Sequence, residues 1–332
     1  MQTKILDCTK ENIRLAAEII KRGGLVAFPT ETVYGLGANA MDECACKKVY
    51  SAKGRPSDNP MICHIADTED IAKLTDNPDA RVKKLMKLFC PGPITLIVSK
   101  KKEVPLVASG GLETIGVRLP DNEIARSLIR FSGVPIAAPS ANISGKPSPT
   151  TYKHVVDDMN NKIDVILKGQ DCRVGIESTV VDTTGKELIV LRPGMLTARE
   201  ISRKIGEPVL YDSSLNKKPT DENFVPKAPG MKYKHYAPKA EMKIFEGSQA
   251  KVKEAVEKAG RDARSQGIKV DVILFDAEDY AVAAHDFFAE LRRMDKENVE
   301  LILCGALKMS DDAGFAVMNR MLKSAGYNIQ KV

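Results

Sequence analysis

The sequence predicts an α/β protein with a larger N-terminal domain on a mixed sheet and a smaller parallel C-terminal domain. Two patterns and the break between them predict this class. Short β-branched runs alternate with helical patterns over the first two hundred residues, and strands alternate regularly with helices after residue 240. Between them, a polar, proline-rich segment fits neither a helix nor a central strand. We expect domains at residues 1–210 and 241–332, joined by a linker at 211–240.

The N-terminal domain is expected to begin with a helix near Glu11 to Arg22 and a buried strand over 25–28 that Pro29 ends. Further strands are predicted at Met61 to Ile65, Thr95 to Ser99, Thr114 to Arg118, Ile136 to Ala138, Asp164 to Leu167, Thr179 to Asp182 and Leu188 to Leu191. So many strands with several short links favour a mixed sheet over a regular doubly wound one.

The C-terminal domain has the predicted order β-α-β-α-β-α. Its strands are expected at Lys243 to Phe245, Val270 to Phe275 and Val299 to Leu303, and its helices at Ala250 to Ser265, Ala281 to Arg293 and Asp312 to Ala325. Right-handed crossovers would make this a small parallel three-layer domain of Rossmann-like type. No G-x-G-x-x-G follows its first strand, so the sequence does not support dinucleotide binding there.

The linker is longer than the ~12 to 15 residues expected of an unstructured connection inside a compact domain. Its length therefore predicts either disorder or a functional loop. The part from Lys227 to Lys239 carries four lysines and no acidic residue. Such a segment could lie over an anionic ligand or form a solvated basic tether.

Composition excludes some classes of function and leaves others open. A net charge of +6 is compatible with nucleotides or RNA, but the absence of Trp and the 5% aromatic content disfavour the stacked-aromatic surfaces of single-strand RNA binders. No run approaches the roughly 18 apolar residues of a membrane span, and no long apolar segment follows Met1, so a cytosolic protein is expected. Seven scattered cysteines without C-x-x-C predict reduced thiols rather than disulfides or a zinc site.

Common catalytic motifs are absent: the sequence contains no Walker A motif, no H-E-x-x-H and no G-x-S-x-G elbow before a helix. Candidate site residues lie instead at predicted strand ends in the first domain. The first group follows Phe28 and Pro29, where Thr30, Glu31, Thr32 and Tyr34 are expected to be exposed before Gly35 and Gly37. Their hydroxyls could bind a small polar substrate, or the segment could be a turn that caps the next helix.

Lys53 and Arg55 stand two residues apart, so in an extended stretch both would project to one side. A planar guanidinium and an ammonium together suit a polyphosphate and its leaving group, although loop cations are commonly solvated. His64 shares a strand face with Ile62 and could equally be a core residue. Arg118, before Leu119 and Pro120, could hold a carboxylate or form a strand-end salt bridge.

Three more groups of polar residues also stand at predicted strand ends. Ser140, Asn142 and Ser144 lie in a turn bounded by Pro139 and Gly145, where hydroxyl, amide and backbone donors would form an anion nest. The segments Glu177-Ser178-Thr179 and Leu191-Arg192-Pro193-Gly194 add hydroxyls and a cation. This shared placement at strand ends predicts a single cleft.

The motifs together resemble the threonylcarbamoyl-AMP synthase family. They are the segments Lys21 to Ala40, Lys53 to Pro60, Pro91 to Thr95, Gly116 to Pro120, Pro139 to Gly145, Glu177 to Asp182 and Leu191 to Gly194. The segment Ala228 to Pro238, followed by a Rossmann-like domain, resembles the two-domain form of that family, whose N-terminal domain is YrdC-like. The resemblance implies a twisted sheet with a basic concave cleft that holds ATP beside L-threonine.

The resemblance also implies roles for individual residues. The threonine contacts would be Thr32, His64, Arg118, Ala138 and Ser178, with Arg118 taking the carboxylate. The ATP contacts would be Lys53, Arg55, Asn59, Thr114, Ser140, Asn142, Ser148, Arg192 and Tyr236, with Tyr233 as the alternative to Tyr236. Lys53 and Arg55 would be the catalytic pair, Mg²⁺ would accompany ATP, and no metal ligand is expected from the protein.

The implied reaction makes L-threonylcarbamoyl-AMP from L-threonine, bicarbonate and ATP and releases pyrophosphate. Its product would go to partner proteins that transfer it to tRNA, with tRNA itself a further candidate partner and no membrane involved. A non-catalytic, double-stranded RNA-binding protein is the main alternative and predicts affinity that falls steeply with salt. A nucleotide-binding scaffold is a third reading, in which the isolated C-terminal domain would bind ATP.

Overall fold

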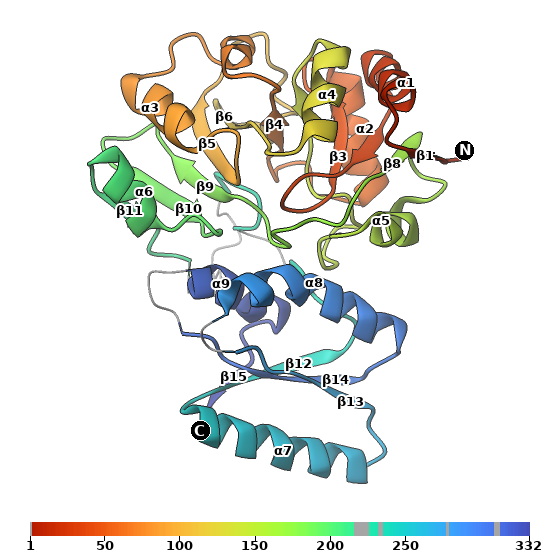
Figure 1. Cartoon of the computed structure of the whole chain (residues 1–332), viewed down its shortest axis with the longest axis vertical. Helices are drawn as coiled ribbons and strands as arrows, with labels where there is room; N and C mark the ends of the chain where they lie inside the picture. Colours follow the sequence, from red (N-terminus) through yellow and green to blue (C-terminus); the bar gives the residue numbers. More distant parts are fainter. Residues whose placement is uncertain (1, 216–225, 232–234, 277–278, 309–312) are drawn as a thin grey trace.

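The computed structural model describes residues 2–215, 226–231, 235–276, 279–308 and 313–332. Its strands form two sheets, one with eleven strands and one with four. The larger sheet carries every strand up to Tyr211, and the smaller sheet begins at Glu241. Figure 1 shows the two sheets in separate parts of the molecule, with helices α8 and α9 of the second part turned toward the first.

The large sheet has the order β1-β8-β2-β3-β7-β4-β6-β5-β9-β10-β11 and contains both parallel and antiparallel pairs. Its strands are β1 (Lys4–Asp7), β2 (Val26–Phe28), β3 (Gly35–Asn39), β4 (Ile62–His64), β5 (Ile94–Ser99), β6 (Thr114–Arg118), β7 (Ile136–Ala137), β8 (Val165–Lys168), β9 (Thr179–Asp182), β10 (Leu188–Arg192) and β11 (Val209–Tyr211). The expectation of a mixed sheet is confirmed.

Helices cover this sheet on both faces. They are α1 (Lys10–Lys21), α2 (Glu43–Lys53), α3 (Ala80–Phe89), α4 (Glu123–Ser132), α5 (Tyr152–Met159) and α6 (Ala198–Ile205), with a 3-10 helix at Thr68–Lys73. Side chains alternate along β2: Val26 and Phe28 pack with α1 and α4, whereas Ala27 packs in the core that α2, α3, α5 and α6 share. Each of these six helices starts at a capping side chain, for example Thr9 and Asp42.

The second part is a parallel sheet of order β13-β14-β12-β15 between helices. Its elements are β12 (Glu241–Glu246), α7 (Gln249–Ser265), β13 (Val270–Ile273), α8 (Tyr280–Lys296), β14 (Leu301–Gly305), α9 (Ala313–Ser324) and β15 (Ile329–Lys331). Phe245 packs with α7 on one face, and Ile244 packs with α8 and α9 on the other. The predicted parallel three-layer domain is confirmed, with β15 as a fourth strand (Figure 1).

Local expectations around the candidate residues need two corrections. Thr30, Glu31, Thr32 and Tyr34 are buried rather than exposed, and the glycines after them belong to strand β3 rather than to a helix-capping turn. Lys53 is the last residue of α2, so it does not share an extended stretch with Arg55. Gly54 ends the helix with φ 61°, a left-handed conformation that glycine adopts without strain.

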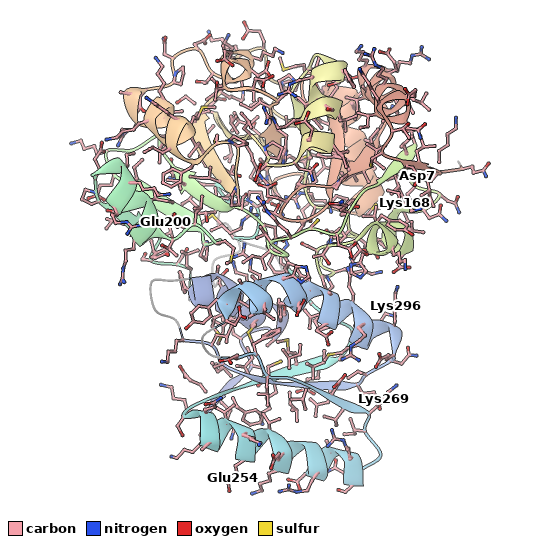
Figure 2. All side chains as sticks on the ribbon, in the orientation of Figure 1. Asp7, Lys168, Glu200, Glu254, Lys269 and Lys296 are labelled. Atoms are coloured by element: carbon pink, nitrogen blue, oxygen red, sulfur yellow. The ribbon has the colours of Figure 1, made fainter. Side chains whose placement is uncertain are left out.

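Ionic contacts join the two parts. Arg292 of α8 donates to Pro147 O at 2.6 Å and to Asp158 Oδ2 at 2.7 Å, and all three groups are shielded from solvent. Lys296 forms a more exposed pair with Asp157 at 2.7 Å. Figure 2 shows Lys296 on the side of the second part that faces the first. In the described part of the chain, no helix is both long and apolar enough to cross a membrane.

Candidate active site

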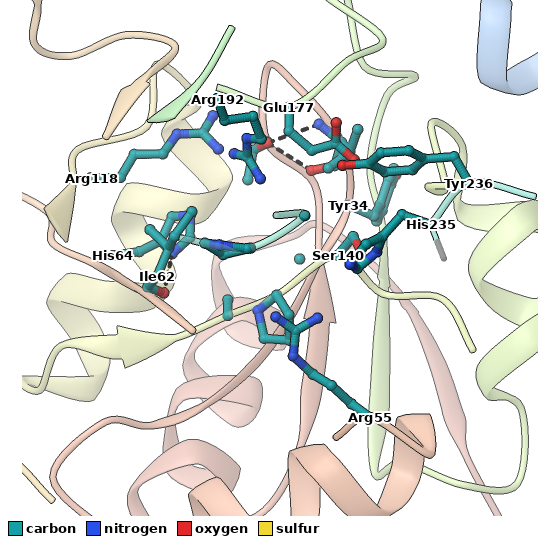
Figure 3. A pocket seen from close by; sticks show the side chains of 17 residues that line it. Tyr34, Arg55, Ile62, His64, Arg118, Ser140, Glu177, Arg192, His235 and Tyr236 are labelled. Carbon is teal, nitrogen blue, oxygen red and sulfur yellow. Dashed lines mark hydrogen bonds between the residues drawn. The ribbon is translucent and has the colours of Figure 1, made fainter. Parts of the chain in front are cut away.

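A cavity lies where strands of the large sheet end and the linker returns to them (Figure 3). Its lining comes from the loop after β2, the loop after α2, strand β4, the end of β6 and the turn after β7. The segment before β9, the end of β10 and the linker complete it. The lining residues are Thr30, Val33, Tyr34, Gly35, Arg55, Ile62, His64, Arg118, Ala138, Pro139, Ser140, Glu177, Arg192, Pro229, Gly230, His235 and Tyr236. Segments far apart in the sequence therefore form one site.

Three arginines line this cavity from different elements. Arg55 follows α2, Arg118 ends β6 and Arg192 ends β10, and Figure 3 shows their guanidinium groups directed toward the same space. Burial lowers the pKa of Arg55 to about 10, which is still well above neutral pH, and burial also lowers the pKa of Arg192 below its ordinary value. A concave, buried surface with three cations attracts a polyanion.

Arg55 is fixed by the loop that follows it. Its Nη2 donates to Asn59 Oδ1 at 2.7 Å and to Pro60 O at 2.9 Å, and its Nε donates to Asn59 O at 3.2 Å. Asn59 does not line the cavity and acts behind Arg55. The guanidinium therefore has a set orientation before any ligand arrives.

Arg192 is held in the same way by Ser178, the residue that immediately precedes β9. Its Nε and Nη2 donate to Ser178 O at 3.1 and 3.0 Å, and its Nη2 also donates to Ser178 Oγ at 3.1 Å. Ser178 Oγ in turn lies 2.8 Å from Thr95 Oγ1. Ser178 thus stands behind Arg192 rather than in the cavity lining.

Lys53 supports the turn after β7. Its Nζ donates to the main-chain oxygens of Ser140 and Asn142, both at 2.5 Å. Ser140 Oγ donates to Asn142 Oδ1 at 2.5 Å, so the three residues form one network of which only Ser140 lines the cavity. Burial and nearby Arg55 lower the pKa of Lys53 well below its usual value.

The remaining candidates divide between the lining and the layer behind it. His64 and Ala138 line the cavity; Thr32 lies behind Thr30, with their Oγ1 atoms 2.9 Å apart, and Ser148 donates to Glu177 Oε1 at 2.5 Å. Thr114 stands at the start of β6, four residues before Arg118, and is outside the lining. Burial, and next to it the charge of Arg118, lower the pKa of His64 to about 3, so its imidazole is neutral.

The linker closes the site. Tyr236 is buried at φ 63°, with its ring centroid 5.0 Å from that of Phe288 on α8. Burial, with nearby Glu177, raises the pKa of Tyr236 to about 12, so the phenol keeps its proton. The alternative Tyr233 lies outside the described residues.

Sequence reasoning missed two polar lining residues. In the sequence, Glu177 stands out only as a neighbour of Ser178, and His235 only as part of the basic linker. Burial works against the charge of Glu177, but Arg320 of α9, Arg192 and Ser148 hold its pKa below the usual value. Arg320 is fully buried and lies 143 residues away from Glu177 in the sequence, so no local sequence pattern could predict that its guanidinium contacts the Glu177 carboxylate.

Comparison with known proteins agrees with this architecture. A domain family described as telomere recombination matches residues 18–194, and one described as the C-terminal domain of threonylcarbamoyl-AMP synthase matches residues 196–326. The chain is 46% identical to the threonylcarbamoyl-AMP synthase of Pyrococcus abyssi, over 96% of each chain. The chain belongs to the threonylcarbamoyl-AMP synthase family. It is therefore an enzyme of this kind, as the resemblance of its motifs implied.

Other members of the threonylcarbamoyl-AMP synthase family agree. The Bacillus subtilis threonylcarbamoyl-AMP synthase is 42% identical over 98% of this chain and 96% of its own. The crystal structure of Pyrococcus abyssi Sua5 complexed with L-threonine superposes with a TM-score of 0.94 at 45% identity, covering 99% of this chain and all of that one. The two-part arrangement of β-sheets is thus similar to that of the Pyrococcus abyssi protein.

Proposed function

We propose that this enzyme makes L-threonylcarbamoyl-AMP from L-threonine, bicarbonate and ATP and releases pyrophosphate. Membership of the synthase family supplies the product. The observation that carries the choice of cosubstrates is the convergence of Arg55, Arg118 and Arg192 on one buried cavity. One amino-acid carboxylate and one polyphosphate would use all three cations.

Threonine would occupy the side of the cavity formed by Arg118 and His64. The structure of Pyrococcus abyssi Sua5 complexed with L-threonine supports the amino acid as a ligand in this family. Arg118 would bind its carboxylate, because a guanidinium offers paired donors in the plane that a carboxylate requires. A neutral His64 can accept a hydrogen bond from the substrate without repelling or protonating its amine.

The triphosphate would lie toward Arg55, Arg192 and Ser140, with Tyr236 over it. Arg55 and Arg192 are oriented by Asn59 and Ser178 before the ligand binds, so little reorganisation would be needed as charge builds on the leaving pyrophosphate. Lys53 would contribute by holding the Ser140 turn, and Thr32, Thr114, Asn142 and Ser148 would complete the walls.

The reaction requires no protein nucleophile. The neutral amine of threonine attacks carbon dioxide and releases a proton to solvent, or attacks bicarbonate with loss of water, and either route gives a carbamate. A carbamate oxygen then attacks the α-phosphorus as the bond from that phosphorus to pyrophosphate breaks. The arginines position the reactants and neutralise the departing charge, as is usual for transfer at phosphorus. The linker over residues 211–240 would act as a lid that shields the carbamate from water.

Mg²⁺ would reach the site bound to the phosphates. The described residues contain no group of three His, Cys, Asp or Glu side chains that could hold a metal ion. Mg²⁺ commonly binds through substrate phosphates and water with one or two carboxylates rather than in an all-protein cage, so ATP itself would carry it. The product would serve tRNA modification in the cytoplasm through transfer proteins.

Mass spectrometry tests the proposal. The purified chain, incubated with threonine, bicarbonate, ATP and Mg²⁺, should form a threonylcarbamoyl adenylate, and omission of threonine or bicarbonate should abolish it. Absence of the adduct, together with RNA affinity that falls steeply with salt, would favour the RNA-binding alternative. ATP binding by the isolated C-terminal domain would favour the scaffold.

A further inference from the structure

Glu31 and Arg118 form a buried ion pair at the wall of the cavity. Glu31 lies in the loop between β2 and β3, and Arg118 ends β6. Oε2 of Glu31 lies 2.8 Å from Nη2 of Arg118, and the two side chains are 2% and 5% exposed. Such a pair is strongly coupled because solvent cannot screen its charges.

The pair leaves hydrogen-bonding capacity unused. Neither carboxylate oxygen of Glu31 has a hydrogen-bond partner, and neither do Nε and Nη2 of Arg118, so the close contact is not aligned as a hydrogen bond. A buried carboxylate is costly unless a charge or hydrogen bonds compensate it. Among the described residues, the charge of Arg118 provides that compensation for Glu31.

The two residues differ in their access to a ligand. Arg118 lines the cavity, whereas Glu31 does not, and the contact between them is buried: Nε and Nη2 of Arg118 are shielded from solvent, as are both carboxylate oxygens of Glu31. Glu31 therefore contacts Arg118 from outside the cavity lining, and Arg118 is the member of the pair that faces the cavity.

The loop that carries Glu31 is fixed. Thr30 Oγ1 donates to Val33 O at 2.7 Å and accepts from the backbone N–H of Thr32 at 3.1 Å. The backbone N–H of Val174 donates to Glu31 O at 2.9 Å. A carboxylate on such a support can determine where a neighbouring guanidinium stands.

We propose that Glu31 is a positioning residue that orients the Arg118 guanidinium to receive the carboxylate of the amino-acid substrate. This role rests on the proposed function, in which Arg118 binds that carboxylate. Bidentate recognition depends on the orientation of the guanidinium plane, so an arginine without its support keeps its charge but loses this geometry. The neutral imidazole of His64 adds no charge that could replace Glu31 on this wall.

Glu31→Gln tests the role because it keeps the shape of the side chain and removes its charge. The KM for threonine should rise roughly tenfold, the scale of one charge-assisted hydrogen bond, while kcat changes by less than about twofold. Binding of L-threoninamide, which lacks the carboxylate, should be the same in the variant and the wild type. Glu123→Gln is the matched control, because Glu123 pairs with Arg130 at 3.3 Å on the exposed side of α4.

Calorimetric binding of threonine and threoninamide gives a second readout. An unchanged threonine affinity in folded Glu31→Gln would overturn the proposal, and so would equal losses for the two ligands, which indicate general damage to the cavity. If Glu31→Gln does not fold, Glu31→Asp is the second variant, because its shorter side chain keeps the negative charge but places it farther from Arg118. We expect the same loss of affinity for threonine and none for threoninamide. A wild-type protein that binds threonine but makes no product would instead contradict the proposed function.

Discussion

Lys323 Nζ on helix α9 donates a hydrogen bond of 2.8 Å to the main-chain oxygen of Gly230, so the C-terminal domain holds the linker segment that closes the cavity. Arg320 lies three residues earlier on the same helix and binds Glu177 in the cavity wall. Together these contacts give the C-terminal domain a structural part in the site, although none of its described residues lines the cavity.

Lys323 should make stability depend on pH above neutrality. Burial, with nearby Arg320 and Arg192, lowers its pKa to about 7, whereas the unfolded chain keeps the ordinary lysine value. Between these two values the unfolded state binds more protons, so stability due to Lys323 rises with pH. The Tm of the wild type minus that of Lys323→Met should therefore increase from pH 6 to pH 9. A constant difference would contradict the burial of this cation.

Arg320→Met should strongly destabilise the fold. The variant leaves the buried carboxylate of Glu177 without its nearest charge partner, which costs about 3 to 5 kcal/mol in comparable buried pairs. Arg293→Met is the matched control, because Arg293 pairs with Asp271, Glu290 and Glu297 near the surface and should cost below about 1 kcal/mol. Urea denaturation measures the free energy of unfolding of both variants. Equal losses would show that the buried pair of Arg320 and Glu177 stabilises the fold no more than the surface pairs of Arg293.

Much of the fold could be predicted because local patterns specify it. The bounds of β6 and β9 agree with the prediction at both ends, since β-branched residues bounded by turn residues form each strand. Strand β3 was missed because Gly35-Leu36-Gly37 has the composition of a turn, and only pairing with β2 and β7 makes it a strand. Strand β15 pairs with β12, eighty-odd residues earlier, and gives an equally weak local signal.

The site was only partly predictable for the same reason. Strand-end position identified Arg118, Ser140 and Arg192, and the spacing of Lys53 and Arg55 identified Arg55; all of these except Lys53 line the cavity. Neither signal could distinguish a lining residue from one that supports it, as with Ser178 behind Arg192 or Lys53 behind Ser140. That distinction depends on which side of a residue faces the cavity, and tertiary packing sets it.

Gly230→Ala should reduce turnover more than stability. Gly230 has φ 90°, and an added Cβ would lie 3.3 Å from the Tyr236 hydroxyl and 3.9 Å from Arg192 Cδ. Gly206→Ala is the matched control, because it has φ 75° with nothing within 4 Å of the added atom. Both variants should lose about 1 to 2 kcal/mol of stability from backbone strain, but Gly230→Ala alone should slow adenylate formation. Equal activity in the two variants would remove the linker from the reaction.

Arg55→Ala should lower kcat by on the order of 10² if Arg55 stabilises the leaving pyrophosphate. Arg55→Lys should recover only part of the loss, because lysine cannot reproduce the contacts of Nε and Nη2 with the 59–60 loop. Arg261→Ala, on the exposed face of α7, provides a control of the same chemistry. Pyrophosphate release under saturating ATP measures the effect, and unchanged turnover in Arg55→Ala would exclude the arginine from the mechanism.

His64 should contribute to acid sensitivity. Its pKa of about 3 in the folded protein lies below the ordinary value near 6.5, so the unfolded chain binds a proton between these values and the folded protein does not. Stability is therefore lost as pH falls below 6.5, by up to about 1.4 kcal/mol per pH unit for one such group. His64→Gln should flatten this part of the stability curve without removing it, because His154, with a pKa of about 4 through burial, acts in the same direction. Denaturation midpoints from pH 4 to 7 measure the slope, and an identical slope in His64→Gln would mean that this imidazole is charged or solvated in the folded enzyme.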